Sequence, residues 1–305
     1  GSEMSTAIRI RLTQRFRSVA LVAALLGFAA TIPVAAADGK IAIVAAENMY
    51  GDIAAQIGGD RVAVTSLISN PAQDPHLFEA SPTAVRALAD ARIAIVNGAD
   101  YDPWMEKPLA AAPRPGRSVV SAAALMGKKP GDNPHLWYDP ATMPRVAEAV
   151  AAALTKADPA HAADFATNLD IVLGSLKRID ARAAVLRGKY KGLPVTATEP
   201  VFGLMAQAIG LINRNERFQL AMMNDTEPTA HDLAEFERDL KERRVRTLIY
   251  NAQVSEALTT RLRALAAAAK IPVVPVTETL PAGMHFQDWV LGELDALDKA
   301  LGEGN

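Results

Sequence analysis

Residues 159–190 read PAHAADFATNLDIVLGSLKRIDARAAVLRGKY and contain no proline after Pro159. Apolar side chains recur through this stretch at the three- and four-residue spacing of one helix face: Phe165, Leu169, Val172, Leu173, Leu176, Ile179, Ala183 and Leu186. A helix of about 30 residues is roughly 45 Å long at the standard rise per residue. Such a helix in the middle of the chain predicts a stiff strut that joins two lobes.

Short β-rich segments alternate with helical patterns on both sides of the strut, as is typical of parallel α/β folds. Before the strut, we expect strands at Lys40–Ala45, Val62–Ile68, Ala91–Val96 and Ser118–Val120, and helices at Met49–Ile57 and Pro82–Ala89. After the strut, we expect strands at Leu193–Thr198, Phe218–Met222, Arg246–Tyr250 and Ile271–Val276, and helices at Gly203–Ala208, Thr229–Arg243 and Ser255–Ala269.

The predicted fold class is therefore α/β, with two lobes that each hold a central, mostly parallel sheet flanked by helices. The chain of 305 residues is also longer than one compact core usually accommodates. We place the N-terminal lobe at residues 38–158, the single linking helix at 159–190 and the C-terminal lobe at 191–305.

Residues 1–37 have the pattern of a tag remnant followed by a secretory signal peptide. The three residues before Met4 resemble the remainder of a cloning tag. A stretch with four arginines precedes an apolar run from Val19 to Ala30, and the small residues Ala35–Ala37 form a cleavage site. A membrane anchor helix is the alternative, but the apolar run is short for a bilayer. We expect cleavage after Ala37.

The composition argues against several classes of protein and site. The formal net charge of −2 gives no support to nucleic-acid binding. The chain has no cysteine, which excludes disulfides, thiolate metal sites and a lipid-modified N-terminal cysteine. We therefore expect a periplasmic protein that is secreted by a cleavable signal peptide and is not lipid-anchored.

Two of the five histidines stand in similar loops. His76 follows Asp74-Pro75, and His135 lies in the run Asn133–Pro140, NPHLWYDP. Each histidine follows a proline, which restricts the backbone next to the ring, and precedes a leucine. By itself the repeated Pro-His-Leu does not establish a shared site. The alternative is that the two histidines are unrelated loop residues. We expect His161 and His231 to be solvated surface residues.

Two carboxylates follow expected strands of the second half. Glu199 comes directly after the strand that ends at Thr198, and Glu278 comes shortly after the strand that ends at Val276. Open parallel sheets bind ligands outside the carboxyl ends of their strands, so both acids should face one crevice. Their position equally allows that each acid caps the N-terminus of a following helix.

The motifs around these residues resemble those of a known family. The run Asn133–Pro140 closely follows the Asn-Pro-His-hydrophobic-Trp-x-Asp-Pro run of the metal-binding receptors of zinc and manganese ABC importers, the cluster A-I family. Asp74-Pro75-His76 is similar to the first histidine motif of that family, and Glu227-Pro228-Thr229 is similar to its Glu-Pro-Ser/Thr helix start. The resemblance covers nearly the whole mature chain, from Ile41 to about Leu301.

The resemblance implies that four ligands, two from each lobe, close on one divalent ion: His76, His135, Glu199 and Glu278. The third position is usually His in the zinc receptors and often Glu in the manganese receptors. The fourth is usually Asp, so Glu278 departs from the pattern by one methylene. The zinc members have a histidine-rich loop that would fall near Arg114–Asp132, where this chain has no histidine.

The resemblance also implies a function: high-affinity capture of Zn(II) or Mn(II) as a transported ligand and delivery to a cognate ABC permease in the inner membrane. Such a receptor acts as a monomer and is not an enzyme.

The chemistry of the four side chains supports this set independently. Two neutral imidazoles and two carboxylates balance the charge of a divalent cation. Zn(II) accepts this mixture in a four-coordinate site, and Mn(II) accepts it when the carboxylates chelate. Because imidazole must lose its proton to bind, we expect affinity to fall below about pH 6. We expect Asp74, Asn133 and Thr277 to orient the ligands.

Three alternatives remain at this stage. A metal-dependent hydrolase is disfavoured because catalytic zinc keeps an open position for water and no H-E-x-x-H motif occurs. A receptor for an organic ligand or a metal chelate would need an aromatic-lined pocket, for which the candidates are Trp104, Trp137, Tyr138 and Trp289. An adhesin or metal chaperone on the same scaffold has no distinguishing sequence signal.

Overall fold

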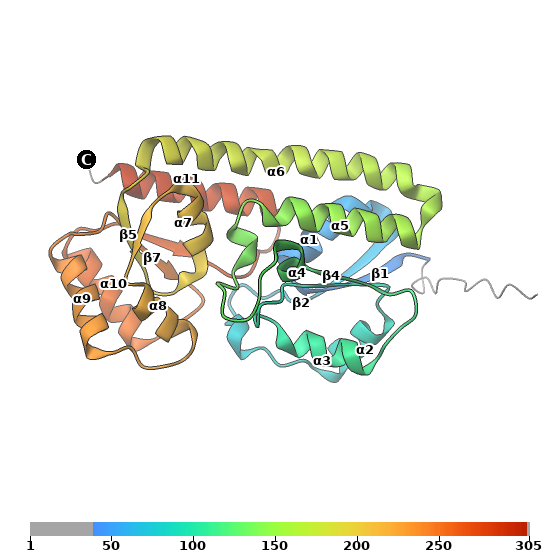
Figure 1. Cartoon of the computed structure of the whole chain (residues 1–305), viewed down its shortest axis with the longest axis horizontal. Helices are drawn as coiled ribbons and strands as arrows, with labels where there is room; N and C mark the ends of the chain where they lie inside the picture. The colour runs from blue at the N-terminus through green and yellow to red at the C-terminus, as the bar shows by residue number, and fades with distance from the viewer. Residues whose placement is uncertain (1–38, 304–305) are drawn as a thin grey trace, which may run out of the picture. The chain divides into compact units, whose positions relative to one another are not determined.

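The computed structural model describes residues 39–303, so the expected tag remnant and signal peptide lie outside the described part. All described residues belong to one compact unit, Pro33–Asn305. They form two four-stranded parallel sheets with helices on both faces, and one long helix lies between the sheets in sequence (Figure 1). The predicted fold class is confirmed.

The N-terminal lobe is built on the sheet β2-β1-β3-β4, whose strands are all parallel. Its strands are β1 (Ile41–Glu47), β2 (Val62–Ile68), β3 (Ile93–Val96) and β4 (Ser118–Ser121). Its helices are α1 (Asn48–Gly58), α2 (Pro82–Asp90), α3 (Pro103–Ala111), α4 (Ala122–Met126) and α5 (Thr142–Ala157). Ser81 caps α2, because its Oγ accepts a hydrogen bond from Ala84 N at the start of the helix.

Side chains of this sheet alternate between two apolar layers, as the period of a strand requires. Ile43 and Ala45 of β1 belong to the main core, which they share with residues of α1 and α5. Val44 and Ala46 point to the other face and pack in a smaller cluster with Leu88 of α2 and Met105 of α3. The sheet is thus buried on both faces, which explains its nearly continuous apolar strands.

The C-terminal lobe repeats this plan on the parallel sheet β6-β5-β7-β8. Its strands are β5 (Pro194–Ala197), β6 (Ile212–Arg214), β7 (Leu248–Asn251) and β8 (Val273–Val276). Its helices are α7 (Gly203–Ile209), α8 (Glu216–Met223), α9 (Ala230–Lys241), α10 (Ala257–Ala268) and α11 (Phe286–Gly302). Leu248 faces a cluster formed with α8, α9 and α10, whereas Ile249 faces the main core.

One predicted strand is wrong. The segment Phe218–Met222 is not a strand but the middle of helix α8, and the fourth strand of this sheet is the shorter β6. A short apolar run fits a buried strand and a buried helix equally well by its pattern. Tertiary packing decides the outcome, because Phe218 is fully buried against Phe236 of α9, with ring centroids 4.8 Å apart.

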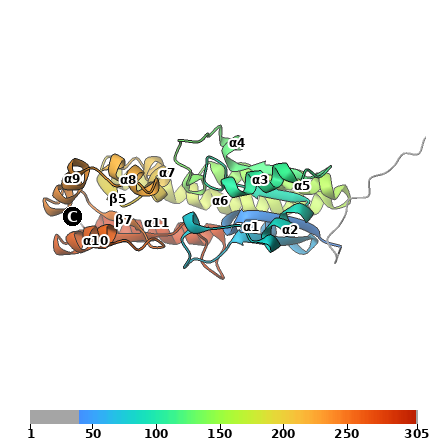
Figure 2. The ribbon, with the colours of Figure 1, turned by 90° about the horizontal axis from the view of Figure 1, so that it is seen from below.

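The predicted strut is helix α6, Ala162–Tyr190, with the short 3₁₀ turn Pro159–His161 before it. Figures 1 and 2 show α6 running along both lobes beside α5 and α11, in agreement with its packing against these helices. Arg182 and Lys189 of α6 form ion pairs with Asp298 of α11 at 2.7 and 2.6 Å. Among residues 39–303 no helix is both long enough and apolar enough to cross a bilayer.

Helix α1 also joins the lobes, through polar side chains four residues apart on one face. Asn48 forms two hydrogen bonds with the backbone of Leu280, at 2.8 and 2.9 Å. Asp52 accepts from Phe286 N, at the start of α11, at 2.8 Å. These contacts and a continuous apolar core tie the two sheets into one body.

Replacing Leu176 of α6 by alanine tests how far this shared core determines stability. Leu176 is 3% exposed and lines a small void. Trp137 of the N-terminal lobe and Phe286 of the C-terminal lobe line the same void. We expect Leu176→Ala to lower the free energy of unfolding of the metal-free protein by about 2–5 kcal/mol, measured by urea denaturation.

Ile171→Ala is the matched control on the same helix, because Ile171 is 66% exposed. Its effect should stay within about 0.5 kcal/mol. Equal effects of the two substitutions would contradict the assignment of the shared core.

Candidate metal centre

The first histidine is held by a 3₁₀ turn at the carboxyl end of β2. Asp74 caps this turn, Pro75–Leu77, by accepting a hydrogen bond from His76 N at 2.9 Å. The side chain of His76 is 33% exposed, and its Nε2 lies 3.4 Å from Glu278 Oε1. Asp74 therefore orients His76 through the backbone, as expected.

The second histidine is fully buried. His135 Nδ1 lies 2.7 Å from Asn133 Oδ1, and its Nε2 lies 2.9 Å from Glu278 Oε1. The amide of Asn133 is itself oriented, because its Nδ2 donates to Pro200 O at 2.9 Å. The hydrogen bond to Asn133 fixes the ring so that Nε2 points to the centre of the site.

The two carboxylates come from loops after strands of the other lobe. Glu278 follows β8, is fully buried, and points its Oε1 at both imidazoles and at the hydroxyl of Tyr101, 3.3 Å away. Glu199 follows β5 and begins the turn Pro200–Phe202. It is 6% exposed, and its buried Oε2 has no hydrogen-bond partner among the described residues.

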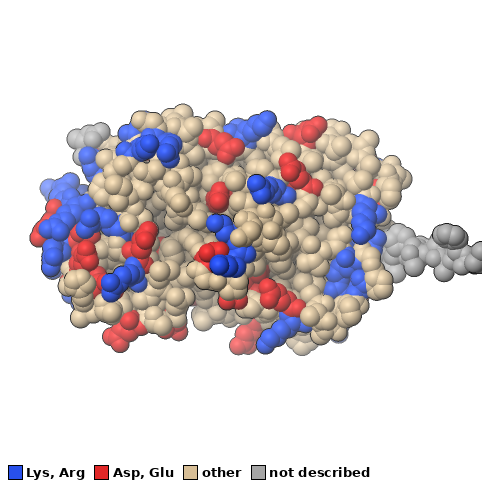
Figure 3. All heavy atoms as spheres, viewed as in Figure 1, with Lys and Arg blue, Asp and Glu red and all other residues tan. Residues whose placement is uncertain are grey.

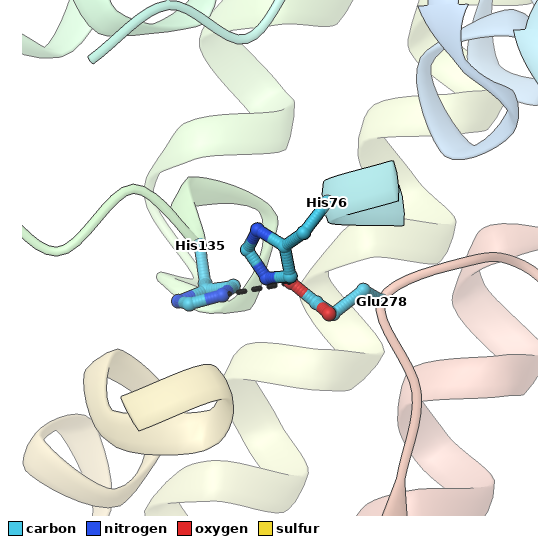
Figure 4. A group of neighbouring side chains, drawn as sticks. All are labelled: His76, His135 and Glu278. Atoms are coloured by element: carbon cyan, nitrogen blue, oxygen red, sulfur yellow. Dashed lines mark hydrogen bonds and ion pairs between the residues drawn. The ribbon is translucent and has the colours of Figure 1, made fainter. Parts of the chain in front are cut away.

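The structure brings three of the four predicted residues into direct contact. His76, His135 and Glu278 each have a ligand atom within 4.8 Å of the others, and their side chains converge in Figure 4. Glu199 lies outside this group. It lines the same cavity as His76, a space of about 440 Å³ whose rim also includes Asp74, Met222, Met223 and Gln253. Donors from both lobes therefore meet at one point beside an open cavity.

The loop that carries His135 also binds both acid-bearing loops. Asn133 contacts Pro200, the residue after Glu199, as described above. Tyr138 donates to Thr277 O, the residue before Glu278, at 2.6 Å, and its hydroxyl also lies 2.8 Å from Glu293 Oε2. Two polar residues of the NPHLWYDP run thus set the distance between His135 and the two carboxylates. Thr277 contributes its backbone carbonyl to this arrangement.

The side chains tune one another's protonation. A hydrogen bond to Glu278 raises the pKa of His76 to about 9. Burial favours neutral Glu278, but the hydrogen bonds from His135 and His76 outweigh it and hold the pKa of Glu278 well below its usual range. Burial and the charge of Glu278 raise the pKa of Glu199 to about 7. Near pH 7 the metal-free site therefore contains a proton on His76, paired with the Glu278 carboxylate.

Sequence reasoning missed two residues that contact the carboxylate of Glu278. Tyr101 is aimed at it by a turn in which Gly98, Ala99 and Asp100 all have positive φ. Asp102 closes that turn by accepting from Asn97 N and Gly98 N at 2.7 and 2.8 Å. Asn251, the second missed residue, donates to Glu278 Oε2 at 2.8 Å. The only available signal was that each lies near the carboxyl end of a strand.

Two further histidines lie elsewhere. The side chain of His161 is 38% exposed and pairs with Asp158. His231 forms a group with Asp232 and Glu235 on α9, but its side chain is 80% exposed. Arg217 and Arg214 lie 3.4 and 3.9 Å from the two acids of this group, so their charges are already balanced. We do not assign a metal site there.

The comparison with known families agrees with this geometry. Residues 43–300 match the family described as zinc-uptake complex component A, periplasmic. The chain belongs to this family. The predicted resemblance to zinc and manganese receptors is thereby confirmed.

Proteins similar to this chain are named for different metals. The zinc-binding protein TroA of Treponema pallidum is 25% identical over 231 residues, which cover 72% of this chain and 73% of that protein. The manganese-binding lipoprotein MntA of Bacillus subtilis is 24% identical over 229 residues, covering 72% and 74%. The solved structure of TroA superposes with a TM-score of 0.71 at 21% identity, covering 86% of this chain and 99% of that one.

Proton release tests the charge state of the metal-free site. Since the pKa of His76 is about 9, its Nε2 carries a proton at pH 7 that an incoming cation must displace. We expect at least one proton to be released per ion bound at pH 7, measured by calorimetry in two buffers of different ionisation enthalpy.

Apparent affinity should also rise by about tenfold per unit between pH 7 and 8, because one proton competes with the cation. As the pH falls, the proton therefore begins to compete with the cation near pH 9. An ordinary imidazole would begin to compete only near pH 6. Binding without proton release at pH 7 would contradict this charge state.

Proposed function

We propose that this protein is a periplasmic solute-binding protein that captures one divalent transition metal ion, zinc or manganese, between its two lobes and delivers it to an ABC transporter permease. The observation that carries the proposal is the convergence of His76, His135 and Glu278 from opposite lobes on one point. Membership of the zinc-uptake family supports the same function.

We propose His76, His135, Glu199 and Glu278 as the ligands of the ion. The unpartnered Oε2 of Glu199 supports its inclusion, because a buried carboxylate oxygen without a hydrogen bond is costly and a cation would remove that cost. On this proposal, the lobe at 38–158 supplies the imidazoles and the lobe at 191–305 supplies the acids, with residues 159–190 between them.

This donor set favours a site that binds a metal ion over a site that catalyses a reaction. Four protein ligands close a tetrahedral shell, whereas catalytic zinc sites usually have three and bind a water. The predicted aromatic residues do not support a receptor for an organic ligand. Trp137, Tyr138 and Trp289 are at most 3% exposed and pack in the core, and the half-buried Trp104 packs against Phe78. The void beside Trp137 measures only about 10 Å³.

We propose a periplasmic location, with secretion by the signal peptide at residues 1–37 and no lipid anchor, since the chain has no cysteine. We expect a monomer whose partner is the cognate permease in the inner membrane. On the face shown in Figure 3, basic and acidic side chains are interspersed, which does not favour a nucleic-acid partner.

The metal content of the protein tests the function directly. Protein purified from the periplasm without added metal should contain close to one equivalent of Zn(II) or Mn(II), measured by native mass spectrometry with elemental analysis. Failure to retain or rebind either ion after chelation would reject the proposal.

The contribution of Glu199 is tested by Glu199→Ala. We expect its affinity for the physiological ion to fall at least tenfold while the circular dichroism spectrum stays unchanged, because a ligand is lost but no core side chain. Competition titration with a chromophoric chelator measures this change.

Glu256→Ala is the matched control, since Glu256 lines the same cavity and its substitution also removes one carboxyl group. Its affinity should stay within about twofold of the unsubstituted protein. If Glu199→Ala behaves like this control, Glu199 is not a ligand.

A further inference from the structure

Asn251 occupies the position between the two carboxylates. It is the last residue of β7, and β7 lies between β5 and β8, the strands that precede Glu199 and Glu278. The side chain of Asn251 is buried, with the residue only 3% exposed. A polar side chain in this place can reach both acids at the carboxyl edge of the sheet.

The orientation of the Asn251 amide follows from its hydrogen bonds. Its Oδ1 accepts from Gln253 N at 3.0 Å, so Nδ2 must point the other way. Nδ2 donates to Glu278 Oε2 at 2.8 Å. The backbone of Asn251 is also tied to the other acid-bearing strand, because its N donates to Thr198 Oγ1 at 3.4 Å.

The two oxygens of Glu278 therefore have different partners. Oε1 faces His135 Nε2 and His76 Nε2, whereas Oε2 is held by Asn251. If Oε2 also turned toward an ion between the imidazoles, the buried amide would lose its acceptor. A buried donor without a partner is destabilising, so Glu278 is set up to offer one oxygen only.

Glu199 is in a related situation. Glu199 follows Thr198, whose Oγ1 accepts from Asn251 N, so this second acid begins next to the same residue. The Oε2 of Glu199 has no partner among the described residues and remains available. With one oxygen from each acid and one nitrogen from each of His76 and His135, the side chains provide four donors.

We propose that Asn251 is a positioning residue that restricts the Glu278 carboxylate to one oxygen and so makes the centre select Zn(II) over Mn(II). Zn(II) is satisfied by four nitrogen and oxygen donors, whereas Mn(II) favours six and gains them from chelating carboxylates. This inference rests on the proposed function and goes beyond it by naming the ion and the residue that selects it.

Asn251→Leu tests the inference, because leucine has a similar branched shape but no donor. Without the amide, Glu278 Oε2 is free to chelate. We expect the ratio of Zn(II) to Mn(II) affinity, from competition titrations with the two chlorides, to fall at least tenfold. X-ray absorption at the zinc edge should show four donors in the unsubstituted protein and five or more in the variant.

Asn213→Leu is the matched control. Asn213 lies in β6 of the same sheet and bonds with Gln219, away from the acids. Its affinity ratio and its donor number should equal those of the unsubstituted protein. If Asn251→Leu matches this control, the inference is wrong although the proposed function stands.

The unsubstituted protein gives a second test that does not depend on how well the variant folds. Five or more donors around its Zn(II), or tighter binding of Mn(II) than of Zn(II), would overturn the role of Asn251 and leave metal capture intact. Failure to bind either ion would overturn both.

Discussion

The fully buried carboxylate of Glu278 is the constraint on which the arrangement of the two lobes depends. A charged group removed from water is strongly destabilising unless opposite charge and hydrogen bonds surround it. Glu278 comes from the C-terminal lobe, but His76, His135 and Tyr101, which surround its Oε1, all come from the N-terminal lobe. The charge is therefore compensated only while the lobes are together. In the metal-free protein the compensating charge is the proton on His76, and in the proposed loaded form it is the cation.

Compensation across the lobes requires that the distances between them are well defined. Near the site, the loop around His135 fixes these distances, because Asn133 binds the loop of Glu199 and Tyr138 binds the loop of Glu278. Helices α6 and α1 fix them at longer range, through the shared apolar core and the polar contacts of α1. One short motif thus carries a proposed ligand and sets its distance from the two carboxylates.

The sequence predicts those parts of the fold and of the candidate site that depend on neighbouring residues in the chain. The spacing of apolar residues identified α6. Parallel strands also place their carboxyl ends at one edge, so side chains in the loops after strands could be expected to lie close together, as His76, His135 and Glu278 do. The prediction of a strand at Phe218–Met222 failed because the apolar pattern of this segment fits a strand and a helix alike. Only its packing against α9 distinguishes the two.

The sequence by itself determined which donors are available, their order along the chain, and the two-lobed α/β frame that carries them, because residue type and hydrophobic period are local properties. Only the tertiary structure decided that three of the four donors touch while Glu199 stands beside them. It alone revealed that Tyr101 and Asn251 reach Glu278 and that Glu199 Oε2 has no hydrogen-bond partner among the described residues. These features depend on hydrogen bonds between side chains far apart in the chain, and their geometry is set only when the two sheets pack into one body.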